Sequence, residues 1–219
     1  ARMKIQYGTS LAYPVQCIGA QVTSVPNRTT GNFASARTRG LVAMCGTFGF
    51  ELDICKSSMA DRAIFRQLLE LYEIIHPIIR YGNLYRLWSP FKTNFAAWMY
   101  VNHSQHQAVV FAFSSNNEHL SSAVPRLCLK GLQPNLHYEV CEPLPNRITQ
   151  NATGNPQQML QVDVPVYQLG RNAVILPGDV LMKVGLPLQF HARDDCVLFT
   201  LCGFRQSITA SAGSFSATG

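Results

Sequence analysis

The chain has 219 residues, 47% of them hydrophobic and 14% charged, which is typical of a globular protein and excludes a largely disordered one. The net charge of +6 arises from 18 Lys and Arg against 12 Asp and Glu, and the basic residues are scattered instead of forming a run. Because nucleic-acid-binding proteins gather basic residues on one face, this pattern predicts no nucleic-acid partner.

No apolar run approaches the ~20 residues that a membrane-spanning helix needs, and residues 1–14 lack the apolar core of a signal peptide. We therefore expect no membrane association, while the sequence leaves the compartment open. The chain does not begin with an initiator Met, which indicates a start inside a longer protein.

The seven cysteines form no CxxC pair, so the sequence predicts neither a zinc ribbon nor a thioredoxin-like motif. Five of them lie in or beside apolar runs, and we expect these five to be buried free thiols that pack as small apolar groups. They are Cys17, Cys45, Cys128, Cys196 and Cys202.

Residues 1–82 predict alternating helices and strands. Residues 1–11 are expected to be the end of a helix that closes before Pro14, because proline disfavours a helical conformation in the residue before it. A strand over 17–24, a helix over 34–45 and a second strand over 47–52 follow. This order is typical of a parallel α/β sheet.

A long amphipathic helix is predicted between Ser58 and Gly82. Ser58 is followed three residues later by Asp61, as in a capping box, and Gly82 is a natural end for the helix. Pro77 is expected to kink or tighten the last turn. Apolar residues recur at helical spacing; they are Ile64, Phe65, Leu68, Leu69, Leu71, Tyr72, Ile75 and Ile79.

After Gly82 the pattern changes to eight short runs rich in β-branched, aromatic and Leu residues, separated by turn-forming segments. The runs read LYRLWS, FAAWMYV, QAVVFAFS, RLCLKG, HYEVCE, QMLQVDVPVY, DVLMKVGLPLQF and CVLFTLCGF. This spacing predicts an antiparallel β-sandwich over residues 83–205. Residues 206–219 are rich in Ser, Ala and Gly, and we predict that they are disordered.

The first part cannot close a sheet by itself, because parallel strands are covered by helices on both faces and a complete (β/α)8 barrel needs about 250 residues. We therefore predict a fold of the α/β plus all-β class. Residues 1–82 form the last part of a (β/α)8 TIM barrel, and the antiparallel β-sandwich follows.

Five segments of the chain, in order, resemble the α-galactosidases of glycoside hydrolase family 36. They read IQYGTSLAYP, GAQVTSVPN, TRGLVAMCGTFGFELD, YGNLYRLWSPF and LPGDVLMKVGLPL. The resemblance runs from residue 1 to about residue 204. It implies that residues 17–24 and 47–52 are barrel strands seven and eight, and that the C-terminal part is the family's β-sandwich.

The resemblance also implies a reaction. Family members use two aspartates, a nucleophile at the end of strand four and a general acid/base at the end of strand six, in a retaining mechanism. Both aspartates would lie before residue 1, so the resemblance places no catalytic residue in this chain. We expect an α-galactoside oligosaccharide as the partner, and we expect the whole protein to be a homo-oligomer. The resemblance implies no cofactor.

Two residues are candidates for substrate binding. Gln21 stands where the family usually has His, near the carboxyl end of strand seven, which is the functional face of a barrel. Asn27, at the end of the same strand, either lines the sugar pocket or forms a turn with Pro26. Thr23 also departs from the family pattern, as do three residues of the following loop, namely Arg28, Thr29 and Asn32.

Other constellations have two readings each. Glu51 and Asp53 form either a carboxylate pair or a strand end and a cap. His103 and His106 are too few for a metal site, and a solvated hairpin loop is the simpler interpretation. The aromatic residues of the first sandwich strands either stack on sugars, as in a lectin, or build the core and the seam with a neighbouring domain. These aromatics are Trp88, Phe91, Phe95, Trp98 and Phe111.

Three functions stay open at this point. The first is part of a retaining α-galactosidase-like hydrolase that acts on terminal α-galactosyl residues. The second is a non-catalytic carbohydrate-binding or assembly module. The third is a galactosyl transferase of the raffinose-synthesis type, which keeps the fold and changes the acceptor.

Overall fold

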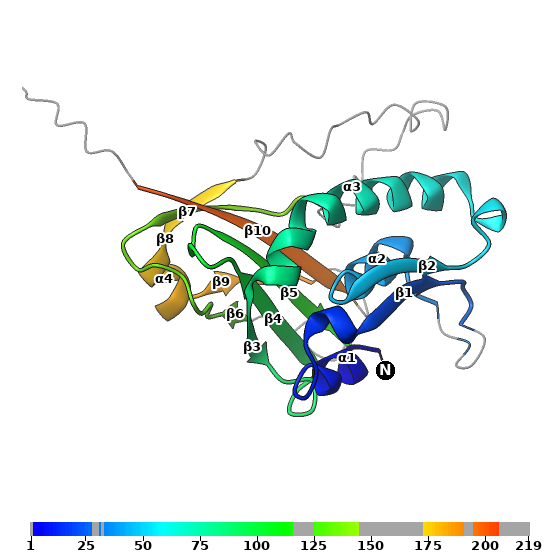
Figure 1. Ribbon diagram of the computed structural model, residues 1–219, viewed down its shortest axis with the longest axis horizontal. Coiled ribbons are helices and arrows are strands. Elements are labelled where there is room, and N and C mark those ends of the chain that lie inside the picture. Colours follow the sequence, from blue (N-terminus) through cyan, green and yellow to red (C-terminus); the bar gives the residue numbers. More distant parts are fainter. Residues whose placement is uncertain are drawn as a thin grey trace, which may run out of the picture.

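The computed structural model of the protein (Figure 1) describes residues 2–27, 31, 33–115, 125–144, 173–190 and 195–205. The chain begins with helix α1 (Arg2–Thr9) and the short 3-10 helix η1 (Val15–Cys17). None of the helices in these ranges is both long and apolar enough to cross a membrane.

A parallel pair of strands follows. β1 (Gly19–Thr23) pairs with β2 (Thr47–Glu51), from Gly19 opposite Thr47 to Thr23 opposite Glu51. Helix α2 (Ala36–Ala43) connects them, as the alternating pattern predicted. The turn into β2 requires glycine, because a Cβ on Gly46 would lie 2.4 Å from the carbonyl oxygen of Ile18.

Helix α3 (Met59–Tyr81) follows the 3-10 helix η2 (Ile54–Lys56). The predicted cap is present, since the Asp61 N–H donates to Ser58 Oγ at 3.0 Å. The helix continues through Pro77 and ends before Gly82, whose N–H donates to the carbonyl of Ile78. Five of the eight residues of the predicted apolar face are buried, whereas Leu69 is exposed. The buried five are Phe65, Leu68, Leu71, Ile75 and Ile79.

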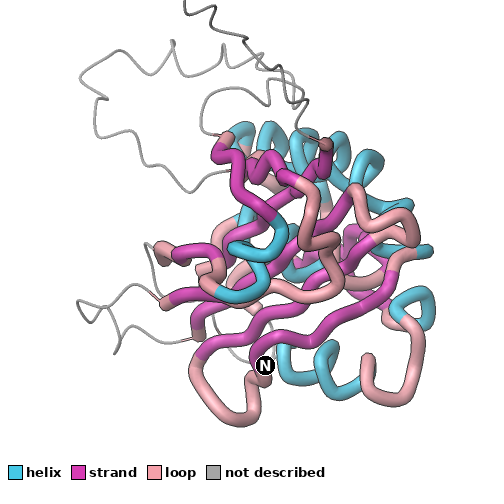
Figure 2. Tube along the Cα trace, turned by 90° about the vertical axis from the view of Figure 1, so that its left-hand side faces the viewer, coloured by secondary structure: helices cyan, strands magenta, loops and turns pink. Residues whose placement is uncertain are grey.

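The second part is built on one six-stranded antiparallel sheet, in which the strands run side by side (Figure 2). Their spatial order is β3 (Asn83–Trp88), β4 (Phe95–Val101), β5 (Gln107–Ser114), β10 (Cys196–Phe204), β7 (His137–Cys141) and β8 (Val174–Pro177). A second small sheet pairs β6 (Arg126–Leu127) with β9 (Leu186–Pro187). The chain thus has the barrel-end and β-sandwich architecture that the sequence predicted.

One predicted strand was wrong in its first half. Residues 179–183 form most of helix α4 (Gly178–Lys183) instead of a strand. Asp179 and Lys183 lie one turn apart and form an ion pair of 3.8 Å, and Gly185 ends the helix at a φ of 82°. Strand β8 was not among the predicted runs. The predicted strand 158–167 and the predicted disordered tail lie outside the described residues.

The central sheet packs on both faces. Alternate side chains of β4 and β5, including Trp98, Phe111 and Phe113, join a core cluster with α2 and α3. The intervening side chains, including Met99 and Val110, join a second cluster with α4 and the small sheet. The seam interpretation of the aromatic zone is therefore confirmed for Trp98 and Phe111, whereas Phe91 is exposed.

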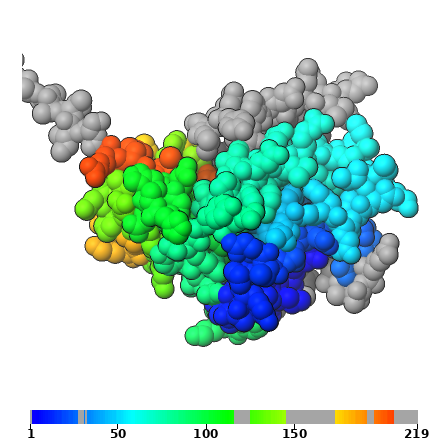
Figure 3. All heavy atoms as spheres, viewed as in Figure 1, coloured from blue at the N-terminus to red at the C-terminus, as the bar shows by residue number. Residues whose placement is uncertain are grey.

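Polar groups also join the two parts across this seam. Arg37 of α2 is buried and donates to the carbonyl oxygens of Leu144 at 2.7 Å and Cys196 at 2.5 Å. Its guanidinium forms ion pairs with Glu142 at 3.3 Å and with the buried Asp195 at 3.4 Å. In the space-filling view, α1 (blue) lies directly against the green residues of the second part (Figure 3).

The cysteine expectation holds for two of the five residues. Cys45 and Cys196 are buried free thiols. Cys17, Cys128 and Cys202 are exposed, so the expectation was wrong for them. An apolar neighbourhood in sequence does not fix the side of the element on which a residue lies, and these three point to solvent.

The thiols are expected to differ sharply in reactivity. Burial raises the pKa of Cys45 and of Cys196 well above the usual thiol value, so both stay protonated at pH 8. We expect iodoacetamide to label the exposed Cys17, Cys128 and Cys202 within minutes and to leave these two thiols unlabelled until the chain unfolds. Peptide mass spectrometry with and without urea measures this, and early labelling of Cys45 would contradict the packing of the seam.

Candidate functional site

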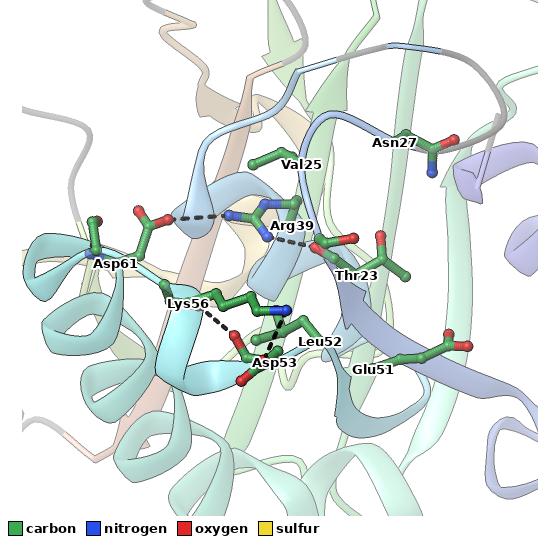
Figure 4. A pocket seen from close by; sticks show the side chains of 12 residues that line it. Thr23, Val25, Asn27, Arg39, Glu51, Leu52, Asp53, Lys56 and Asp61 are labelled. Atoms are coloured by element: carbon green, nitrogen blue, oxygen red, sulfur yellow. Dashed lines mark hydrogen bonds and ion pairs between the residues drawn. The ribbon is translucent and has the colours of Figure 1, made fainter.

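A cavity of about 650 Å³ lies at the carboxyl ends of β1 and β2 (Figure 4). The end of β1, the start of α2, the end of β2, η2 and the start of α3 all contribute to its wall. In parallel α/β folds, ligands bind at this end of the strands, because the loops that vary in sequence meet there. The cavity is therefore the first candidate for a functional site.

Arg39 organises the base of this cavity. Its guanidinium donates to the carbonyl oxygens of Thr23 at 2.5 Å and Ala34 at 3.1 Å, and forms an ion pair with Asp61 at 3.6 Å. It also lies over the Phe65 ring, 5.7 Å from the centroid. Burial lowers the pKa of Arg39, and the Asp61 carboxylate opposes this. Through these contacts Arg39, which lies in α2, connects the end of β1 to α2 and α3.

The structure does not bring Glu51 and Asp53 together as a carboxylate pair. β2 ends at Glu51, whereas Asp53 lies in the loop, where its Oδ1 accepts from the Cys55 N–H at 3.1 Å. Asp53 also forms an ion pair with Lys56 at 3.4 Å, and Figure 4 shows Glu51 pointing away from this pair. Asp53 therefore has the structural role of a cap, which was the simpler of the two interpretations.

Of the two predicted binding residues, Asn27 lines the cavity. Gln21 lies in the middle of β1, outside the cavity wall and on the exposed face of the strand, whereas Asn27 lies in the loop after β1. Ala20 and Val22 are buried beneath the helices, so alternation places Gln21 on the opposite face, which is the interior side of a barrel. Arg28, Thr29 and Asn32, which depart from the family pattern, lie outside the described residues.

Sequence reasoning missed part of the cavity wall. Thr23, Glu51 and Lys56 line it, and none was proposed to bind substrate. Thr23 is paired with Glu51 in the parallel β1–β2 register. Both lie at the last position of a parallel strand, which is the signal by which they could have been found.

No group of three His, Cys, Asp or Glu side chains within the described ranges is placed to hold a metal ion. His103 and His106 lie in the loop between β4 and β5, where a ring nitrogen of His106 is 2.8 Å from the carbonyl oxygen of Ser104. This is the predicted hairpin loop.

Two family models match the chain. The Melibiase model matches residues 1–82, and the model of the glycosyl hydrolase family 36 C-terminal domain matches residues 95–201. The chain is 44% identical over 140 residues to α-galactosidase AgaA of Geobacillus stearothermophilus and 42% identical over 139 residues to α-galactosidase 1 of Pediococcus pentosaceus. These alignments cover 64% of this chain and 19% of each relative.

Solved structures agree with this. The chain superposes on the family 36 α-galactosidase AgaB of Geobacillus stearothermophilus with a TM-score of 0.74 and 34% identity, over 93% of this chain and 24% of that one. The α-galactosidase of Lactobacillus brevis gives a TM-score of 0.75 at 28% identity, over 94% of this chain and 25% of that one. Variants of AgaA have been solved in complex with raffinose and with stachyose.

The chain spans about a fifth of the length of the curated relatives it matches. The two family models follow each other along it in the order barrel, then C-terminal domain. With these matches and the barrel-end and sandwich architecture, the chain belongs to glycoside hydrolase family 36 and corresponds to the C-terminal portion of its α-galactosidases.

Proposed function

We propose that the chain works as part of a retaining α-galactosidase, which hydrolyses terminal α-galactosyl residues of oligosaccharides. The observation that carries this proposal is the cavity at the carboxyl ends of β1 and β2, in a chain whose relatives are α-galactosidases. Variants of AgaA have been solved with raffinose and with stachyose, and the same class of substrate is proposed here. The reacting aspartates would come from the barrel strands that this chain does not contain.

In this proposal β1 and β2 are the last two barrel strands, and their carboxyl ends complete the wall of the sugar site. Asn27 and Gln21 are the proposed substrate contacts. A carboxamide both donates and accepts hydrogen bonds, which matches the hydroxyl groups of a sugar. The domain boundary is proposed at Gly82, between α3 and β3, and the whole protein is proposed to be a homo-oligomer.

A chimera tests the proposal. Residues 1–205 of this chain replace the matched C-terminal part of AgaA, whose remaining part supplies the rest of the barrel. We expect the chimera to hydrolyse p-nitrophenyl α-galactoside with retention of the anomeric configuration. Proton NMR of the released galactose measures this configuration. A folded chimera without activity would contradict the proposal that these strand ends fit a galactoside site.

Within the active chimera, Asn27→Ala and Gln21→Ala are expected to lower kcat/KM by roughly 5- to 100-fold, the effect of losing one or two hydrogen bonds to substrate. Asn83→Ala is the matched control, because Asn83 is an exposed amide at the start of β3, outside the cavity. Equal kcat/KM for Asn27→Ala and the control would show that Asn27 does not contact the substrate.

The 219-residue chain alone is expected to show no turnover. Without a nucleophile and an acid at the ends of strands four and six, the covalent step has neither of its reacting groups. Purified chain and AgaA are compared on the same chromogenic substrate. Activity that disappears when a residue of this chain is replaced would show that the reacting groups have been placed in the wrong part of the barrel.

A further inference from the structure

Gln6 of α1 is a buried polar side chain at the contact of α1 with β3 and β4. The residue is 4% exposed, and neither its Oε1 nor its Nε2 has a hydrogen-bond partner in the described part of the chain. A buried amide in this state destabilises a fold, because it has lost its hydrogen bonds to water without replacement. Such a group needs an explanation in a seam that is otherwise well packed.

The Gln6 side chain lines a cavity of about 10 Å³ between α1 and the first two strands of the sheet. Trp98 and Leu84 form apolar parts of its wall, and Arg86 and Tyr100 form polar parts. A volume of this size is at the lower limit for one water molecule and is too small for any larger ligand.

The polar groups of the wall have hydrogen-bonding capacity left. Arg86 donates through Nε and Nη2 to Ser10, and no described group accepts from its Nη1. The Tyr100 hydroxyl donates to the carbonyl oxygen of Cys45 at 3.3 Å, which leaves its oxygen able to accept. Burial raises the pKa of Tyr100 well above its usual value, so this hydroxyl stays protonated and neutral.

We propose that this cavity binds one ordered water molecule, which bridges the Gln6 amide to Arg86 and Tyr100. The water accepts from Arg86 and donates to Tyr100, and the amide supplies the third bond through its oxygen or its nitrogen. Three bonds are the usual number for a buried water. The water then joins α1 to β3 and β4, and it accounts for a buried amide that no protein group satisfies.

A crystal structure of the full 219-residue chain at 1.5 Å or better tests the site directly. We expect density for one water about 2.7–3.2 Å from a Gln6 side-chain atom and from Arg86 or Tyr100. A dry cavity, or a Gln6 side chain turned to a protein partner, would overturn the proposal.

Replacement of Gln6 gives a second test whose sign separates the alternatives. Gln6→Met keeps the length of the side chain and removes the amide. If the water is present, the variant loses a buried hydrogen bond, and we expect the folding equilibrium constant to fall roughly five- to tenfold in urea titration. If the cavity is dry, the same change removes an unsatisfied amide, so unchanged or increased stability would overturn the proposal.

Two further variants complete the test. Lys4→Met is the control on α1, because Lys4 is exposed and lysine and methionine have similar helix propensities. Tyr100→Phe removes the hydroxyl that accepts a hydrogen bond from the proposed water. In the double variant with Gln6→Met we expect the two losses to be less than additive, because both remove the same bridge. Strict additivity would show that the two groups do not share a ligand.

Discussion

Arg37→Met is expected to destabilise the folded chain by about 3–5 kcal/mol, the range measured when one partner of a buried ion pair is removed. The variant leaves the carboxylate of Asp195, which is 2% exposed, without its arginine. It also removes the donors to the carbonyl oxygens of Leu144 and Cys196. Urea unfolding followed by circular dichroism measures the change.

Arg66→Met is the matched control, because Arg66 is an exposed arginine on α3 and should change stability by less than about 0.5 kcal/mol. A second variant separates charge from packing. Combining Arg37→Met with Asp195→Asn should recover part of the loss, since the buried carboxylate is then neutral. A loss below about 1 kcal/mol for Arg37→Met would mean that this cluster does not hold the two parts together.

Amide hydrogen exchange is expected to be at least about 100-fold faster in β1 and β2 than in β5, a difference that reflects local opening. β5 lies between β4 and β10 in the six-stranded sheet and is buried on both faces. β1 and β2, in contrast, pair only with each other among the described strands. Gly19, Gln21 and Glu51 are exposed, so one face of the pair meets solvent.

Exchange followed by mass spectrometry resolves the peptides that contain these strands. Light scattering on the same sample establishes whether the chain is a monomer, because a second copy could cover the open face. Equal protection of β1 and β5 in a monomer would show that α2 and α3 alone stabilise the parallel pair, and that the barrel end is an independent folding unit.

The sequence predicted the elements whose signals are local. The apolar spacing of α3, with Ser58 as its cap, identified that helix at both ends. The segment after Pro177 was harder, because a short apolar run fits a strand and a helix equally well. There the Asp179–Lys183 ion pair and the positive φ of Gly185 favour a helix.

Contacts between distant residues were beyond sequence patterns. Nothing around Arg37 indicates that its guanidinium meets Glu142 and Asp195, more than a hundred residues later. The site shows the same limit. Asn27 was identified because a strand end was predicted there, and it lies in the loop that follows β1. The role of Arg39, in contrast, depends on Asp61 and Phe65, which approach it only in the folded chain.

Both parts of the chain pack on the central sheet, and this limits where two family members can recombine. One face of β4 and β5 carries Trp98, Phe111 and Phe113, and all three are buried against the helices of the preceding part. A cut at Gly82 would therefore expose a continuous aromatic surface on one product, which invites aggregation. Recombination between relatives should survive selection when the crossover lies ahead of α1, so that both sides of this surface are inherited from one parent.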